Sequence, residues 1–401
     1  MWEQIRSNRF RSVILVAGIG ILLLLVGYFL GLYFFNSGIG GLIIALIIWG
    51  VLNLVAYFQG DNIMLAVSRA RKISRDDHPR LYNIVEEMKI ASGLDRMPDI
   101  YIIDDPALNA FATGRDSNKT AVAITSGLLQ KLNRDELQGV IGHEISHIKN
   151  RDVLLMAMCS VLLGTIVILA WYGSRFMFFS GATRTRRSSS SGGGLGQLLI
   201  LVVAIVLMIL APIMAQLIYF AISRRREYLA DASSALYTRY PEGLASALEK
   251  LAASTSQLKS ANQATAPMYI INPLHKKGMS ASDLTSTHPP TSERIRILRS
   301  MSGASFIDYD RAYQQVYRTR KNLIPASAAT STGVVSLRAA RLEAVEEEPN
   351  ELQRARHTSD LLWRFNNFKT ITCDCGTKLR VPPKFKESTI KCPHCGRIHT
   401  V

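Results

Sequence analysis

Four stretches of the chain are uncharged and dominated by apolar residues, and they cover residues 13–35, 38–58, 153–172 and 198–222. Each contains at least the roughly 20 residues that a helix needs to cross about 30 Å of hydrocarbon. The pattern therefore predicts four transmembrane helices and excludes a simple soluble protein. The first stretch is too long for the core of a signal peptide and lacks a small-residue cleavage site, so we expect it to remain in the mature chain.

The spacing of these stretches predicts the organisation of the chain. Only Asn36 and Ser37 separate the first two, which must form a tight antiparallel hairpin. The last two form a second hairpin around a loop rich in Ser and Gly, which cannot bury side chains. The first transmembrane hairpin is predicted at 1–58 and the second at 153–222. The second hairpin separates the two parts of a water-exposed domain, at 59–152 and 223–322. A linker at 323–367 and a compact tail at 368–401 follow.

Within the first water-exposed part the apolar pattern changes from helix to strand and back. Pro79 begins a helix with a 3.6-residue period that ends near Gly93. Turn-forming residues then separate three short strands, which predict a small sheet at 100–103, 110–113 and 120–125. Another helix begins after Asn133, whose side chain forms a capping box with Glu136. We expect this helix to run through residue 149 and to continue into the third apolar stretch.

Basic residues exceed acidic ones by 47 to 31, a net charge of +16. They gather at the ends of the apolar stretches that would lie on one side of the membrane, which predicts a multi-pass protein of the cell (inner) membrane with both termini and the water-exposed domain in the cytoplasm. The excess thus favours contact with anionic lipid over nucleic acid. Four arginines in the connection between the last two stretches count against this orientation: Arg175, Arg184, Arg186 and Arg187.

The second capped helix contains the H-E-x-x-H sequence His143-Glu144-Ile145-Ser146-His147. Its two imidazoles are four residues apart, so they lie on one helical face and can share a zinc ion. Catalytic zinc takes three protein ligands and a water. Glu227 and Asp231, just after the fourth stretch, also share a helical face, so one could bind the metal while the other orients a histidine. Alternatively, both form local ion pairs with the neighbouring arginines.

Four motifs in this order, interleaved with four apolar stretches, resemble the HtpX-type membrane zinc metalloproteases, relatives of the CAAX prenyl protease. The motifs are N-A-F-A-T-G at 109–114, G-L-L at 127–129 leading through H-E-x-x-H to K-N-R-D at 149–152, R-E-Y-L-A-D at 226–231, and S-T-H-P-P at 286–290 with Arg294 beyond. The resemblance covers roughly residues 1–300. It implies four transmembrane helices with an α+β zincin-like catalytic domain.

The resemblance also implies roles for individual residues. His143, His147 and Glu227 would bind zinc, Glu144 would be the general base, and Asp231 would orient a ligand. His288, supported by Arg294, would stabilise the oxyanion, although His288 could equally just begin the helix after the two prolines. The segment beginning Asn109-Ala110-Phe111-Ala112 resembles an edge strand that pairs with an extended substrate; its alternative is an ordinary core strand.

The expected reaction is hydrolysis of a peptide bond without a covalent intermediate, because zinc activates water and Glu144 can transfer its proton. Recognition through the main chain constrains sequence little, so we expect unfolded or damaged membrane proteins as substrates. The resemblance likewise implies protein quality control and stress response.

The tail contains a second cluster of metal-binding residue types: Cys373 and Cys375, then Cys392 and Cys395. Two thiolate pairs resemble a structural zinc ribbon, which would stabilise a unit with little core of its own. The first pair has C-x-C instead of C-x-x-C spacing, so His394 or His399 could replace one ligand. Disulfides are disfavoured in a reducing cytoplasm. The basic tail is expected to bind an unknown partner, with an adaptor or substrate favoured over nucleic acid.

Two other classes of function compete with the protease. A non-catalytic membrane scaffold would recruit partners through the ribbon and keep the histidines for folding. A transporter would use Pro212 and Gln216 in the fourth stretch as a broken-helix polar site. Glu144 favours the protease, because a structural zinc site does not need a carboxylate between its histidines.

Overall fold

The computed structural model describes residues 2–116, 119–154, 156, 224–260, 266–271, 273, 288–324, 335–338 and 348–401, with isolated positions between 175 and 213. Most of the third and fourth apolar stretches, including Cys159, Pro212 and Gln216, lies outside the described residues.

The first two apolar stretches form the predicted helical hairpin, α1 (Trp2–Phe35) and α2 (Gly38–Val67). The Ser37 hydroxyl accepts a hydrogen bond from the backbone of Gly40 at 3.1 Å and so caps α2. The helices touch backbone to backbone, since a Cβ added to Gly31 would lie 2.5 Å from the Cα of Gly41.

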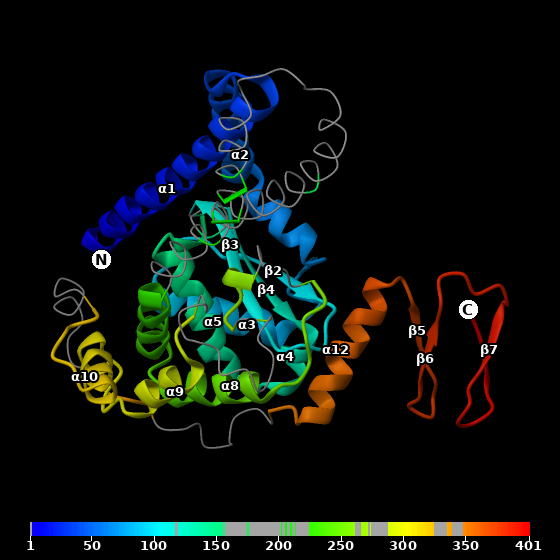
Figure 1. Cartoon of the computed structure of the whole chain (residues 1–401). Coiled ribbons are helices and arrows are strands. Elements are labelled where there is room, and N and C mark those ends of the chain that lie inside the picture. Colours follow the sequence, from blue (N-terminus) through cyan, green and yellow to red (C-terminus); the bar gives the residue numbers. More distant parts are fainter. Residues whose placement is uncertain are drawn as a thin grey trace.

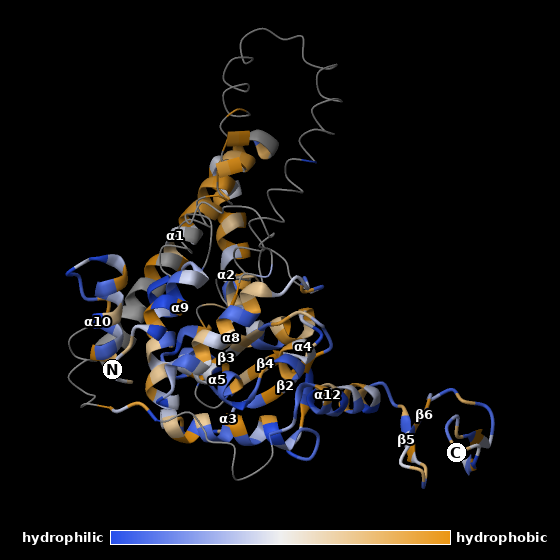
Figure 2. Cartoon of the chain, turned by 90° about the horizontal axis from the view of Figure 1, so that it is seen from below, coloured by the Kyte–Doolittle hydropathy of each residue, from blue (hydrophilic) through white to orange (hydrophobic). Residues whose placement is uncertain are grey.

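Length and composition qualify α2 as a membrane-spanning helix, and the described part of the chain contains one such helix. Large apolar side chains are exposed along it. Figure 2 colours most of α2 as hydrophobic. In a membrane protein, such side chains face lipid. The prediction of four transmembrane helices is therefore supported for α2 and stays a prediction for the last two apolar stretches.

A four-stranded sheet, in the order β1-β2-β4-β3, forms the centre of the water-exposed domain. β2 and β4 are parallel, and the other pairs are antiparallel. The three predicted strands are present as β2 (Asp99–Ile103), β3 (Ala110–Asp116) and β4 (Lys119–Thr125). The sequence analysis missed β1 (Arg71–Ile73), because three residues of which two are basic show no alternation.

Helices cover the two faces of the sheet differently. One face packs its alternate residues, such as Ile102 and Val122, against α3 (Pro79–Ser92) and α5 (Arg134–Lys149). The other face packs Phe111 and its neighbours against the end of α2. The membrane helix is thus anchored directly on the sheet, as Figure 1 shows.

The helix with the two histidines ends sooner than expected. α5 has the predicted capping box of Asn133 and Glu136 at its start, but it ends at Lys149 with Asn150 as its C-cap. Arg151 then takes a left-handed conformation with φ of 59°, and helical structure resumes at Asp152. The expectation of one continuous helix into the third apolar stretch is wrong, because this backbone reversal interrupts it.

The remaining helices surround α5. They are α4 (Ser126–Lys131), a helix over residues 224–238, α8 (Pro241–Ala253), the short 3-10 helix η1 (Ala266–Met268), α9 (Thr291–Arg299) and α10 (Phe306–Tyr317).

The expected linker contains a regular helix, α12 (Glu351–Phe365), which begins with a capping box between Asn350 and Gln353. Thr358 and Leu361 are buried, and Arg354 donates a hydrogen bond to the carbonyl of Gln130 in α4. The predicted linker, in which we expected some weak helix, thus contains a regular amphipathic helix that packs on the water-exposed domain.

Beyond α12 the tail forms two short antiparallel hairpins that extend away from the main body in Figure 1. Their strands are β5 to β8, at Lys369–Thr372, Lys378–Val381, Thr389–Lys391 and Ile398–Thr400. Asp360 of α12 forms ion pairs with Lys378 and Arg380 of β6, so the helix and the first hairpin are in direct contact.

Candidate metal centre

The two histidines of α5 turn their Nε2 atoms toward one point inside the domain. These atoms are 3.3 Å apart, and both side chains are buried. Glu227 comes from the helix over 224–238, and its Oε2 lies 3.6 Å from His143 Nε2 while its Oε1 lies 3.6 Å from His147 Nε2. Ligands about 2.05 Å from a tetrahedral ion lie about 3.3 Å from one another, so His143, His147 and Glu227 have the spacing of a zinc site.

The electrostatics of Glu227 also fit a bound cation. Its Oε2 atom is buried and accepts no hydrogen bond from the described residues. Burial opposes its charge, but the nearby histidines outweigh burial and lower the pKa of Glu227, so that it is an anion at neutral pH. This oxygen also lies 3.6 Å from His288 Nε2 and 3.7 Å from Arg294 Nη1, and a buried carboxylate oxygen without a hydrogen bond from the described residues is suited to bind a cation.

Asp231 holds the first histidine from behind. Its Oδ1 atom lies 2.9 Å from His143 Nδ1, one helical turn beyond Glu227. Burial disfavours the charged imidazolium, but Asp231 and Glu227 outweigh it and raise the pKa of His143 to about 9. Because Nδ1 is engaged by Asp231, Nε2 faces the centre, which is the arrangement of an oriented metal ligand.

The guanidinium of Arg294 in α9 fixes Asp231 in turn. It donates to the two carboxylate oxygens at 2.7 and 2.8 Å and to the carbonyl of Ile270 at 3.0 Å, and it is fully buried. We expected Arg294 to support His288, but these contacts make it a positioning residue for Asp231 and thereby for His143.

Asp152 has the same role for the second histidine, and the sequence analysis missed it. Its Oδ2 atom lies 3.4 Å from His147 Nδ1, and its Oδ1 atom lies 4.0 Å from the guanidinium of Arg226. Asp152 can reach His147 because the chain reverses at Arg151. The K-N-R-D motif contained the signal, but spacing alone cannot reveal a contact that requires a left-handed residue.

Glu144 lies between the ligands, and it is buried. Burial raises the pKa of Glu144, and the two neighbouring histidines partly offset this effect. The backbone N–H of Ala112 also stabilises its charged form, which places Glu144 beside β3. A raised pKa makes the carboxylate of Glu144 a stronger base than an exposed glutamate, as proton transfer requires.

Comparisons with known proteins agree with this geometry. The model of peptidase family M48 matches residues 75–302, more than half of the chain. The chain belongs to peptidase family M48. It is 47% identical over 300 residues to a protease HtpX homolog of Dictyoglomus turgidum, covering 75% of this chain and 94% of the relative. It is 40% identical over 301 residues to the homolog of Lactobacillus helveticus, covering 75% and 100%. The predicted resemblance to HtpX-type metalloproteases is therefore confirmed.

A solved structure, S. mikatae Ste24p, is also similar, with 20% sequence identity and a TM-score of 0.39 over 74% of this chain and 67% of that one.

The last M48 motif places His288 at the same centre. Its Nε2 atom lies 3.6 Å from Glu227 Oε2, and burial lowers its pKa to about 4. His288 therefore does more than begin α9, because it lies buried against a predicted zinc ligand. Its role as oxyanion donor stays a prediction.

The predicted substrate strand lies at the edge of the M48 domain's sheet. The carbonyl of Ala110 accepts a hydrogen bond from Ile270, and the side chain of Asn109 donates to the carbonyl of Ile271. Phe111 is buried against Tyr269, and Ala112 is buried beside Glu144. Strand β3 thus runs past the metal centre. The segment around Ile270 contacts β3 at the carbonyl of Ala110, the first residue of the strand. Substrate pairing along it stays a prediction.

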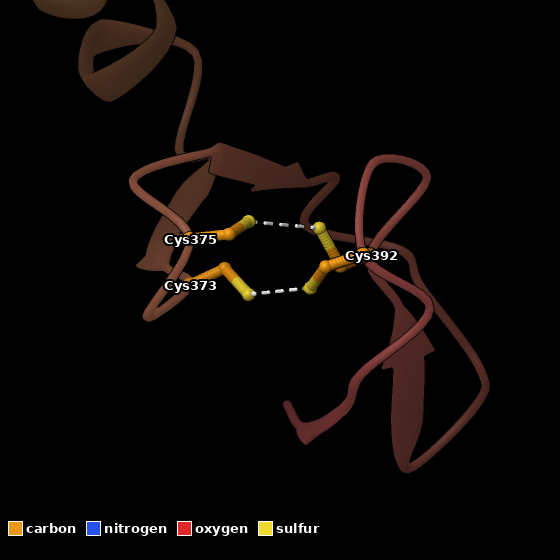
Figure 3. A group of neighbouring side chains, drawn as sticks. Cys373, Cys375 and Cys392 are labelled. Atoms are coloured by element: carbon orange, nitrogen blue, oxygen red, sulfur yellow. Dashed lines mark hydrogen bonds between the residues drawn. The ribbon is translucent and has the colours of Figure 1, made fainter.

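The four cysteines of the tail come together from the two hairpins, as Figure 3 shows. Cys373 and Cys395 have sulfur atoms 3.4 Å apart, and those of Cys375 and Cys392 are 3.7 Å apart. All four are free thiols. Sulfur atoms about 2.3 Å from a tetrahedral zinc ion lie about 3.8 Å from one another, so this cluster also fits zinc, even with the short C-x-C spacing.

Proposed function

We propose that this M48 peptidase is a zinc-dependent endopeptidase that cuts misfolded or exposed segments of membrane proteins at the cytoplasmic face of the cell membrane. The convergence of His143, His147 and Glu227 supports the zinc centre, because three buried ligand types meet at tetrahedral spacing. A zinc ion held there would supply Lewis-acid chemistry, acidifying a water molecule and polarising the scissile carbonyl.

The chain's own residues would perform the proton transfers and fix the geometry. Glu144 takes the proton of the attacking water and delivers it to the leaving amine. Asp231 and Asp152 keep the two imidazoles in one tautomer and orientation, which holds their Nε2 atoms toward the centre. His288 is positioned beside Glu227 to donate a hydrogen bond to the oxyanion.

Location and substrate class rest on different observations. The contact between α2 and the sheet keeps the catalytic domain at the bilayer surface, and the basic flanks of the apolar stretches favour the cytoplasmic side. The edge position of β3 supports recognition through the main chain, which suits unfolded segments of many sequences.

Replacing Glu144 by Gln tests the reaction. The variant should keep its zinc and its fold but lose cleavage of an unfolded membrane protein in detergent or liposomes. Glu86→Gln, which removes a carboxylate from α3, is the matched control and should cleave like the parent. Undiminished turnover by Glu144→Gln would refute the role of Glu144 and favour the membrane scaffold.

We further propose that the cysteine cluster holds a structural zinc ion and that the tail docks an adaptor or substrate. Metal analysis should then find two zinc ions per chain. His143→Ala should lower the count to one, and so should the double substitution Cys392→Ser and Cys395→Ser. One ion in the parent chain would eliminate one of the two sites, and the variants would show which.

A further inference from the structure

A cavity of about 380 Å³ lies next to the metal centre and is not used by the proposed reaction. Its walls come from the helix over 224–238, from α9 and α10, and from the residues after α10. They include three cations, three tyrosines and one carboxylate, so the lining carries two net positive charges: Arg224, Arg225, Lys321, Tyr228, Tyr313, Tyr317 and Glu293.

The carboxylate of the cavity is already engaged by the tyrosines. The Tyr317 hydroxyl donates to Glu293. The Tyr228 hydroxyl lies 2.5 Å from that of Tyr317, and it must donate because the proton of Tyr317 is used. Arg225 and Lys321, in contrast, are exposed. A ligand that enters the cavity therefore meets cations, and its complement is an anion.

The position of the cavity indicates where the anion comes from. Arg224 follows the fourth apolar stretch with only Ser223 between them, so the cavity lies at the end of a predicted membrane span. The amino-terminal end of α1, the start of the first membrane helix, lies on the same flank of the molecule as α10 in both Figure 1 and Figure 2. Arginine, lysine and tyrosine are typical of the headgroup region of a bilayer.

We propose that this cavity binds the phosphate group of an anionic phospholipid. Arginine recognises phosphate through charge-assisted hydrogen bonds, and lysine adds a point charge. The tyrosine rings pack edge to face, with 5.4 Å between the centroids of Tyr228 and Tyr313, and form a rigid amphipathic wall for the rest of the headgroup. Inorganic phosphate shares the recognition chemistry, but the membrane boundary offers the lipid at far higher local concentration.

A lipid at this site would also lie between the helix that carries Glu227 and α9, which carries Arg294. Tyr228 directly follows Glu227, and Glu293 directly precedes Arg294. A ligand that contacts both helices from the cavity therefore favours the arrangement in which Arg294 reaches Asp231, and it should raise the melting temperature of the chain.

The test uses the full chain in a neutral detergent, with short-chain phosphatidylglycerol as the anionic probe and phosphatidylcholine as the zwitterionic one. Binding is followed by native mass spectrometry and by the shift in melting temperature. The variant is Arg225→Gln with Lys321→Gln. The matched control removes two exposed cations from the same region outside the cavity, Arg296→Gln in α9 with Arg311→Gln in α10.

Phosphatidylglycerol should bind saturably and raise the melting temperature, whereas phosphatidylcholine should do neither. Because each cation near a headgroup contributes about 1 kcal/mol, the double variant should bind roughly 20- to 30-fold more weakly, and the control should bind like the parent. The proposal is overturned by equal binding of both lipids or by equal weakening in variant and control. Displacement of the lipid by millimolar inorganic phosphate would assign the cavity to free phosphate instead. Zinc content, measured in parallel, reports separately on the metal centre.

Discussion

The pair of Arg294 and Asp231 offers a direct test of how the metal centre is held together. Arg294→Met removes the guanidinium but keeps a similar apolar volume, and it leaves the Asp231 carboxylate buried and only 2.9 Å from His143. Removing one partner of a buried ion pair costs about 3–5 kcal/mol, because the remaining carboxylate loses the group that engaged both of its oxygens and keeps only its contact with His143. For a domain of this size, about 2–4 °C are lost per kcal/mol, so the melting temperature should fall by roughly 6–20 °C.

The same helix provides the control. Arg299 in α9 also pairs with two carboxylates, Glu242 and Glu249, at 3.0 and 2.9 Å, but these groups are exposed. Because solvent screens such pairs, Arg299→Met should cause no measurable loss. Both variants should be melted in EDTA, so that zinc binding to the folded state does not change the comparison.

A third variant tests whether Arg294→Met destabilises the chain through the Asp231 charge left without its arginine or through loss of packing. Adding Asp231→Asn to Arg294→Met removes the buried negative charge that has lost its arginine but keeps an amide oxygen facing His143, so the double variant should melt above Arg294→Met alone. Equal losses of melting temperature in Arg294→Met and Arg299→Met would show that the Arg294–Asp231 pair does not stabilise the metal centre. A melting temperature of the double variant below that of Arg294→Met would show the same.

Two other predictions concern residues near the centre and far from it. Asp152→Ala should weaken zinc binding about 10- to 100-fold in chelator competition, because it frees Nδ1 of His147, whereas Asp99→Ala, which removes an exposed ion pair with Lys72, should not. His78 caps α3 by accepting from the backbone of Leu81, and burial, with Arg80, lowers its pKa to about 4 from 6.5. Between pH 4 and pH 6.5 the unfolded chain therefore binds more protons than the folded chain. Neutral His78 contributes roughly 3 kcal/mol to the free energy of unfolding above pH 6.5, and this contribution is lost as the pH falls to 4. His78→Asn keeps a cap that does not titrate, and its unfolding free energy should fall less over this range than that of the parent; parallel curves would contradict this assignment.

Local signals in the sequence predicted the parts of the fold that depend on neighbours along the chain. The hairpin of α1 and α2 follows from two apolar stretches with two residues between them. The start of α5 follows from the capping box of Asn133 and Glu136, and the strands follow from alternation between turns. Each of these features is decided within a few residues, which is the range over which propensity and pattern act.

Features that depend on one unusual backbone conformation or on a partner distant in the sequence could not be predicted from local sequence signals. The left-handed Arg151 ends α5, although a mid-sequence arginine carries no signal for such a conformation. Only weak helix was predicted around α12, because Ala, Ser, Thr and charged residues surround its capping box of Asn350 and Gln353 and because its buried Leu361 has a partner surface only in the folded domain.

The site shows the same division, and it explains why the family motifs extend beyond the zinc ligands. His143 and His147 could be predicted as ligands because their spacing on one helix and their chemistry are typical of a metal site, and Glu227 was predicted from the family resemblance. Their supports could not, since Asp152 reaches His147 through a chain reversal and Arg294 reaches Asp231 from a helix 63 residues away. Each imidazole is thereby held by a carboxylate that has its own arginine, Arg226 on one side and Arg294 on the other. Asp152 comes just before the third apolar stretch, and Arg226 and Asp231 come just after the fourth. We therefore predict that the ligands are oriented only when these two stretches have inserted correctly into the membrane.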